Sequence, residues 1–169
     1  GKILDGASVV WKPLGEVALI TIGEFVHKNN QIILGKYPVY NGGKEPTGYY
    51  DKYNNIGNRI IVSARGANAG YVNKISTPYW AGNSCYSIDI KDITKLNWKF
   101  IFFYLKHSEN KLIDEQQKGS IPSVSKKQME SISIPIPPIH VQEEIVRILD
   151  TFTELTTELT TELTAELTA

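Results

Sequence analysis

The last 29 residues constrain the fold of this chain more than any other stretch. From Val141 to Ala169 there is no glycine and no proline, so no residue interrupts a helix. The apolar residues recur at intervals of 3, 4, 3 and 4 through Ile145, Ile148, Phe152, Leu155 and Leu159. This heptad spacing predicts a coiled-coil helix roughly 43 Å long with one apolar seam.

The same stretch is a tetrapeptide repeat. Thr-Glu-Leu-Thr begins at 153, 157 and 161, and Ala-Glu-Leu-Thr follows at 165. Each unit lengthens a helix by about 6 Å, which is typical of an adjustable spacer. Threonine is a middling helix former, so a lone helix of this composition is marginal and a partner helix is expected. The residues predicted to face that partner are Ile145, Ile148, Leu149, Phe152, Leu155, Leu159 and Leu163.

Charge is distributed unevenly, although the whole chain has a net charge of zero. Residues 1–140 carry 17 basic and 11 acidic side chains, a net of +6, whereas residues 141–169 carry 1 and 7, a net of −6. A basic body favours a polyanionic partner, and the acidic helix favours a different one.

The body, residues 1–138, alternates short β-favouring runs with loops rich in glycine and asparagine. The runs are VALITI, KYPVY, RIIVSA, YVNKI and CYSIDI, and the loops are 41–44, 54–58, 66–70 and 82–84. The pattern predicts an α+β domain with a curved, mostly antiparallel sheet that displays its loops at one end. A helix beginning at Asn97 is expected to pack on the sheet, before a polar loop at 116–127 and an extended segment at 134–138. The second unit, 139–169, is the spacer helix.

Several protein classes are excluded by composition. The only cysteine, Cys85, cannot form an internal disulfide or a cysteine-based zinc site. No run of about 18 apolar residues occurs, and the first residues lack the layout of a signal peptide. A cytoplasmic protein without a membrane partner is therefore expected.

Catalytic motifs are also lacking. The patterns GxxxxGK[ST], GxGxxG, HExxH and GxSxG do not occur. Glu109-Asn110-Lys111 resembles an acidic-x-Lys nuclease element, but positions i and i+2 of a helix point apart. Ile136-Pro137-Pro138-Ile139 has the prolines of an amino-methyltransferase motif without its polar and aromatic residues. We therefore expect no catalytic residue, no metal and no cofactor in this chain.

A binding surface is the interpretation that remains for the basic body. Lysine and arginine contact phosphates, while asparagine, serine and arginine can contact base edges. The predicted DNA-binding residues are Asn41, Lys44, Tyr49, Arg65, Asn68, Lys118, Ser120, Ser123, Lys126 and Lys127, with Lys52, Arg59 and Lys74 as further basic residues. The alternatives are a solvated lysine surface, tyrosines that only pack the sheet, and a plain turn at 65–70.

The chain resembles the specificity subunits of type I restriction-modification enzymes over essentially its whole length. The most specific part is residues 142–150, Gln-Glu-Glu-Ile-Val-Arg-Ile-Leu-Asp, together with the repeat that follows. The other matching segments are Ile3–Gly6, Val10–Glu16, Tyr37–Gly43, Gly48–Tyr50, Arg65–Gly70, Gly119–Pro122, Ser125–Lys127 and Ile134–Pro138.

The resemblance implies a non-catalytic target-recognition domain on a spacer helix that binds double-stranded DNA. It implies as partners the methyltransferase (modification) subunits, which use S-adenosylmethionine to methylate adenine, and indirectly a motor-nuclease subunit. A full subunit continues into a second recognition domain, so a chain that stops at Ala169 is expected to be a half-subunit, natural or truncated. Two copies paired through the helix would recognise an interrupted palindrome.

Two alternatives from other classes stay open at this point. One is a coiled-coil adaptor without sequence-specific DNA binding, and the other is an enzyme with an unrecognised site. The sequence does not identify the bases recognised, the spacer length between half-sites, or which helix face meets a second copy and which meets the methyltransferase.

Overall fold

A four-stranded antiparallel sheet forms the centre of the body. In the computed structural model, which describes residues 6, 8–114 and 121–168, the strand order is β2 (Ala18–Ile22), β8 (Cys85–Ile90), β5 (Arg59–Ser63) and β6 (Val72–Ile75). Successive side chains of β5 point to opposite faces. Ile60 and Val62 enter the main core, while Ile61 faces a second, smaller apolar cluster.

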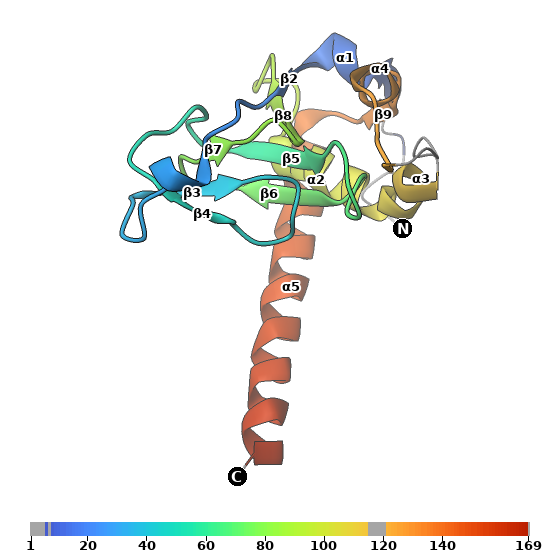
Figure 1. Ribbon diagram of the computed structural model, residues 1–169. Coiled ribbons are helices and arrows are strands. Elements are labelled where there is room, and N and C mark those ends of the chain that lie inside the picture. Colours follow the sequence, from blue (N-terminus) through green and yellow to red (C-terminus); the bar gives the residue numbers. More distant parts are fainter. Residues whose placement is uncertain (1–5, 7, 115–120, 169) are drawn as a thin grey trace.

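Helix α2 (Trp98–His107) covers the face of this sheet that carries Ile60 and Val62 (Figure 1). Asn97 starts the helix because its side-chain oxygen accepts the N–H groups of Lys99 and Phe100, at 2.9 and 3.2 Å. Ile101 and Leu105 are completely buried against the strands. Helix α3 (Glu109–Asp114) follows after a break at Ser108.

A three-stranded sheet lies against the opposite face, which carries Ile61. Its order is β4 (Gly48–Tyr50), β3 (Tyr37–Tyr40) and β7 (Trp80–Ala81), with β3 and β7 parallel and β3 and β4 antiparallel. Tyr79 and Ala81 are buried with Ile61 and Cys85 in the small cluster. A 3-10 turn, η1 (Lys28–Asn30), precedes β3.

The two ends of the body meet in a third, two-stranded sheet. Strand β1 (Val10–Pro13) pairs antiparallel with β9 (Ser133–Ile136), the strand that leads into the long helix. Helix α1 (Leu14–Val17) follows β1, and helix α4 (Lys126–Glu130) precedes β9. The capping box of Ser125 and Gln128 fixes the start of α4.

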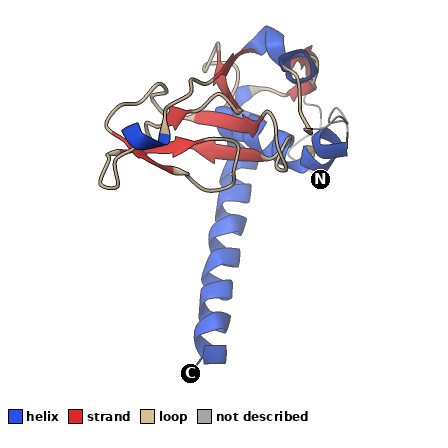
Figure 2. Ribbon diagram, in the orientation of Figure 1, coloured by secondary structure: helices blue, strands red, loops and turns tan. Residues whose placement is uncertain are grey.

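Helix α5 (Ile139–Thr168) projects from the body as a single rod (Figures 1 and 2). Only its first turns touch the domain, through buried Val141, Gln142 and Val146 and an ion pair of 3.1 Å between Lys99 and Asp150. Every described residue from 151 to 168 is exposed. No helix within residues 8–114 or 121–168 has the length and apolar character needed to cross a membrane.

The side chain of Gln142 joins α5 to the body through three hydrogen bonds. Its amide is fully buried, accepts the Asn97 N–H at 2.8 Å, and donates to the carbonyls of Lys95 at 2.9 Å and Pro137 at 2.8 Å. The amide oxygen accepts one hydrogen bond and the amide nitrogen donates two. These bonds set the angle at which α5 leaves the domain.

Replacing Gln142 with leucine should lower the free energy of unfolding by about 2–4 kcal/mol, because three backbone groups lose their partner at once. Urea unfolding followed by circular dichroism measures this change. Glu143→Ala, on the exposed neighbouring residue, is the matched control and should stay within about 0.5 kcal/mol of wild type. Equal stability of the Gln142 variant and the control would contradict this role.

The α+β class and the long C-terminal helix are confirmed, and each of the five β-favouring runs contains a strand. The expected single curved sheet is instead divided into three sheets. The polar loop expected at 116–127 ends earlier, because Ser125 caps α4. The helix beginning near Asn97 is broken at Ser108, where the Glu109 carboxylate turns to accept the Val72 N–H of β6 at 2.7 Å.

Candidate nucleic-acid interface

Three loops meet at the end of strand β5. The Ser63 hydroxyl donates to the Gly42 carbonyl at 2.6 Å, and the Ala64 N–H donates to the Ser84 carbonyl at 2.8 Å. The loops 41–47 and 82–84 are thereby attached to the start of the loop 64–71. The exposed side chains of these loops include Lys44, Glu45, Thr47, Arg65, Asn68 and Asn83. The end of the sheet thus presents amide, hydroxyl and basic groups together, with one carboxylate among them.

Two glycines allow this close approach. Gly42 has a φ of 86°, and a Cβ there would lie only 3.0 Å from the Ser84 carbonyl oxygen. A Cβ on Gly82 would overlap the side-chain oxygen of Asn41. Gly42 is therefore required both by its φ and by the close Ser84 carbonyl, and Gly82 leaves room for the side chain of Asn41.

The segment before α4 joins the same group of loops. The Gly66 N–H donates to the Pro122 carbonyl at 2.9 Å, and the Val124 N–H donates to the Ala64 carbonyl at 2.8 Å. Arg65 and Ser123 form an isolated β-bridge between these hydrogen bonds. Residues about 60 apart in the sequence are thus neighbours, and Lys126 and Lys127 lie exposed just beyond them at the first turn of α4.

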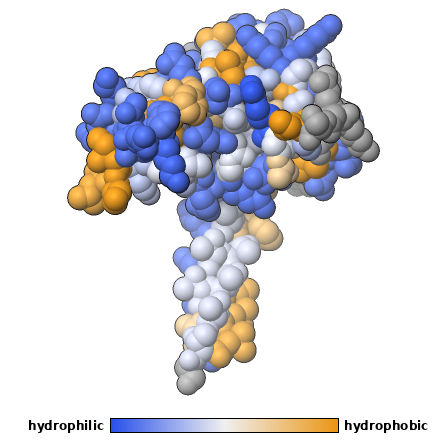
Figure 3. All heavy atoms as spheres, in the orientation of Figure 1, coloured by the Kyte–Doolittle hydropathy of each residue, from blue (hydrophilic) through white to orange (hydrophobic). Residues whose placement is uncertain are grey.

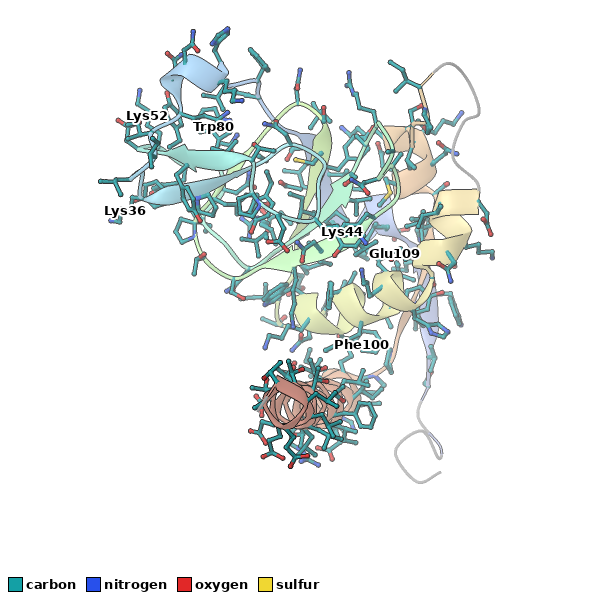
Figure 4. All side chains as sticks on the ribbon, turned by 60° about the horizontal axis from the view of Figure 1, so that its bottom comes forward. Lys36, Lys44, Lys52, Trp80, Phe100 and Glu109 are labelled. Carbon is teal, nitrogen blue, oxygen red and sulfur yellow. The ribbon has the colours of Figure 1, made fainter. Side chains whose placement is uncertain are left out.

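Two lysines lie close to the ring of Tyr71 beside these loops. Lys106 of α2 lies 4.0 Å and Lys44 lies 5.2 Å from the centre of the Tyr71 ring. Lys106 also contacts the Glu109 carboxylate at 2.7 Å and the Val72 carbonyl at 2.9 Å. Figure 4 shows Lys44 and Glu109 close together over α2. The charge of Lys106 is largely neutralised by Glu109, whereas exposed Lys44 has no such carboxylate partner among the described ion pairs.

The structure brings most of the predicted DNA-binding residues together at this end. We call them the loop face: Asn41, Lys44, Arg65, Asn68, Ser123, Lys126 and Lys127. Tyr49 lies apart on β4, paired with Pro38 and 44% exposed. Lys118 and Ser120 fall outside the described residues.

Other predicted features lie elsewhere or have other partners. The loop 54–58 precedes β5 and so lies at the opposite end of that strand, which corrects the expectation that all four loops share one end. Arg59 pairs with Asp89 at 3.2 Å, and Lys74 lies 5.1 Å from the Phe102 ring centre. The side chains of Arg59 and Lys74 therefore make contacts within the folded body. Sequence spacing gave no signal for Lys106, which reaches Tyr71 from a helix 35 residues away.

The groups weighed for catalysis are engaged in structural roles. Burial raises the pKa of the Cys85 thiol to about 12, so it stays protonated and unreactive. Glu109 and Lys111 lie on α3, and the Glu109 carboxylate is held by Lys106 and by the Val72 N–H. Among residues 6, 8–114 and 121–168, no group of three or more histidine, cysteine, aspartate or glutamate side chains could hold a metal ion.

The predicted partner-facing residues divide into two groups along α5. Ile145 packs against the core of its own domain, and Leu149 is half-buried there. Beyond them an apolar stripe is open to solvent, as Figure 3 shows along one side of the rod. This leucine stripe consists of Ile148, Phe152, Leu155, Leu159 and Leu163, which are 40% to 69% exposed.

The rest of the exposed helix provides little stabilisation of its own. Each threonine hydroxyl from Thr151 to Thr168 donates to the carbonyl four residues earlier. Glutamates at 154, 158, 162 and 166 repeat at the four-residue interval at which like charges repel. An amphipathic helix whose polar side contributes so little normally gains its stability from packing of its apolar side against a partner.

Comparison with known proteins gives one consistent family. The family model described as "Type I restriction modification DNA specificity domain" matches residues 9–169. A putative type I restriction enzyme specificity subunit of Haemophilus influenzae is 34% identical over 159 residues, which is 92% of this chain. The chain spans about 40% of the length of that relative.

Solved structures share the fold. The S subunit of a type I restriction-modification system from M. genitalium superposes with a TM-score of 0.82 at 23% identity, over 93% of this chain and 42% of that one. The HsdS subunit from Thermoanaerobacter tengcongensis gives a TM-score of 0.67 at 20% identity, over 93% of this chain and 42% of the other.

Proposed function

The chain belongs to the type I restriction-modification DNA specificity family, and from this premise we propose that it recognises one half of a bipartite DNA site. The observation that carries the proposal is the loop face. Four segments far apart in the sequence converge there and present basic, amide and hydroxyl side chains around β5. Lys44, Lys126 and Lys127 suit phosphates, and Asn41, Arg65 and Asn68 suit base edges.

The second part of the proposal is that two copies pair through the leucine stripe. The stripe runs from Ile148 to Leu163, and its midpoint lies between Leu155 and Thr156. In an antiparallel pair with this midpoint on the two-fold axis, Ile148 faces the partner's Leu163 and Phe152 faces the partner's Leu159. Both bodies then stand at opposite ends of the pair, with the two Leu155 side chains in contact near the centre.

Two-fold symmetry determines the kind of site recognised. Identical domains related by a two-fold axis contact identical half-sites in inverted orientation, so the target is an interrupted palindrome. The stripe spans 16 residues, with a rise of about 22 Å from Ile148 to Leu163, which holds the two domains apart and leaves a gap of uncontacted base pairs.

Chemistry is assigned to separate subunits in this proposal. The chain directs methyltransferase subunits to their adenines and binds no cofactor itself, while S-adenosylmethionine binds to those subunits. The motor-nuclease subunit joins the assembly indirectly. The described residues support this division, since the one thiol is buried and Glu109 is engaged within the fold.

Substitutions on the loop face test DNA recognition. Lys126→Ala should weaken binding to duplex DNA of any sequence and lower the slope of log K against log salt by about 1, because one phosphate contact is lost. Arg65→Ala should instead relax the base preference at one position. Fluorescence anisotropy at several salt concentrations measures both, first on mixed-sequence duplexes and then on a selected site.

Lys95→Ala is the matched control for the loss of a lysine. Lys95 is 81% exposed and lies in the turn after β8, at the other end of the sheet. Its loss should leave the salt slope unchanged. An unchanged slope for Lys126→Ala together with unchanged base preference for Arg65→Ala would contradict the loop face, and would favour an adaptor that binds proteins through α5 alone.

A further inference from the structure

A tight turn before β3 exposes two aliphatic side chains at its tip. The Gly35 N–H donates to the Ile32 carbonyl at 3.0 Å, which places Ile33 and Leu34 at the two central positions. These side chains are 93% and 92% exposed. Such positions normally hold glycine, asparagine, aspartate or serine, so the fold itself gives no reason for two large apolar residues there.

The tip is held firmly against the sheet. The Ile32 N–H donates to the Tyr49 carbonyl at 2.8 Å, and a Cβ on Gly35 would lie only 2.7 Å from the Tyr50 nitrogen. The turn therefore packs directly on β4. A tip fixed in this way loses little conformational freedom when it enters a partner.

Lysines flank the tip in the sequence. Lys28 and Lys36 lie within six residues of it, and the stretch from 25 to 44, between Glu24 and Glu45, contains no carboxylate; Asp51 follows β4, on which the turn packs. Figure 3 shows an apolar patch at the outer end of β3 and β4 bordered by hydrophilic residues, and Figure 4 shows Lys36 and Lys52 at that same end. A polyanion with an apolar interior matches this combination, and a DNA duplex is such a partner.

We propose that Ile33 and Leu34 form a wedge that enters a base step of the bound DNA and bends the duplex, while Lys28 and Lys36 contact the flanking phosphates. The inference rests on the proposed function. Gly35, Lys36 and the four residues of β3, which span about 13 Å, separate the wedge from the Asn41–Lys44 loop, so the two elements contact different parts of the bound DNA.

The test first selects preferred duplexes with the wild-type chain from a pool of 40-base-pair DNA containing 20 random positions. The selected site is then placed at several positions along a longer DNA fragment, and the gel mobility of the complexes as a function of that position reports the bend angle. Wild type should bend it by at least about 20°. The double variant Ile33→Asn, Leu34→Asn should lose the bend and bind about tenfold more weakly, while it still selects the same bases.

Ile93→Asn is the control, because Ile93 is 77% exposed but lies after β8, away from the turn. It should bend and bind the duplex as wild type does. If the wild-type chain binds the duplex without bending it, the wedge is overturned and the proposed function stands. The same holds if the double variant bends the duplex as much as wild type does. A double variant that bends DNA but no longer copurifies with the methyltransferase subunit would make the tip a protein contact. A wild-type chain that selects no duplex would overturn the proposed function and the wedge with it.

Discussion

Replacing Leu155 with glutamate is expected to convert the paired chain into monomers, with association weakened at least about 100-fold. Leu155 is 59% exposed in one copy and lies next to the proposed two-fold axis, so the substitution puts two carboxylates against each other in an apolar seam. Burying an unpaired charge costs about 3–5 kcal/mol, and each 1.4 kcal/mol is a tenfold change in affinity. Sedimentation equilibrium at micromolar concentration measures the change.

Thr157→Glu is the control for the added charge. Thr157 follows two residues later and about 200° around the helix, so its side chain points away from the stripe. This variant should pair almost as wild type does. A Leu155→Glu chain that still pairs with wild-type affinity would place the contact between copies on another surface.

Deleting one repeat unit, residues 157–160, should change the DNA site rather than abolish recognition. The deletion shortens the separation between the two bodies by about 6 Å, because four residues at about 1.5 Å each are lost from the overlap. Base pairs are about 3.4 Å apart, so the gap between half-sites should shrink by one or two base pairs while both half-sites stay the same. Sequencing methylated adenines in DNA exposed to the chain and its methyltransferase measures the gap.

The double variant Thr157→Ala, Thr160→Ala is the length control for this deletion. It removes two hydroxyls that bond only to the helix backbone and keeps every leucine in place. Its gap should equal that of wild type. An unchanged gap after the deletion would show that α5 does not set the distance between half-sites.

The fold was predictable where local patterns determine it. The absence of glycine and proline and the heptad spacing predicted α5 to within two residues at its start, and β-favouring runs between turn clusters predicted β2, β3, β5, β6 and β8. Short strands such as β7, with two residues, depend on pairing with distant segments and have no local pattern of their own. The capping box that starts α4 was visible in the sequence as Ser125 and Gln128.

The loop face was predictable in its residue types but not in its geometry. Glycine and asparagine marked the loops, whereas the bridge between Arg65 and Ser123 joins segments that no spacing rule connects. Arg59 resembled the other basic residues in sequence, and only the structure pairs it with Asp89. The run Asn-Gln-Ile-Ile-Leu-Gly at 30–35, with apolar residues between turn formers, was a visible signal for the exposed tip.

The pattern of methylation that the chain directs tests its proposed recognition of DNA most directly. The chain would be co-expressed with a type I methyltransferase subunit with which it forms a soluble complex, and the host DNA sequenced for modified adenines. We expect a symmetric bipartite motif, with two inverted half-sites separated by a fixed gap. An asymmetric motif would mean that another chain contributes the second half, and no methylation from a soluble complex would contradict the proposed recognition of DNA.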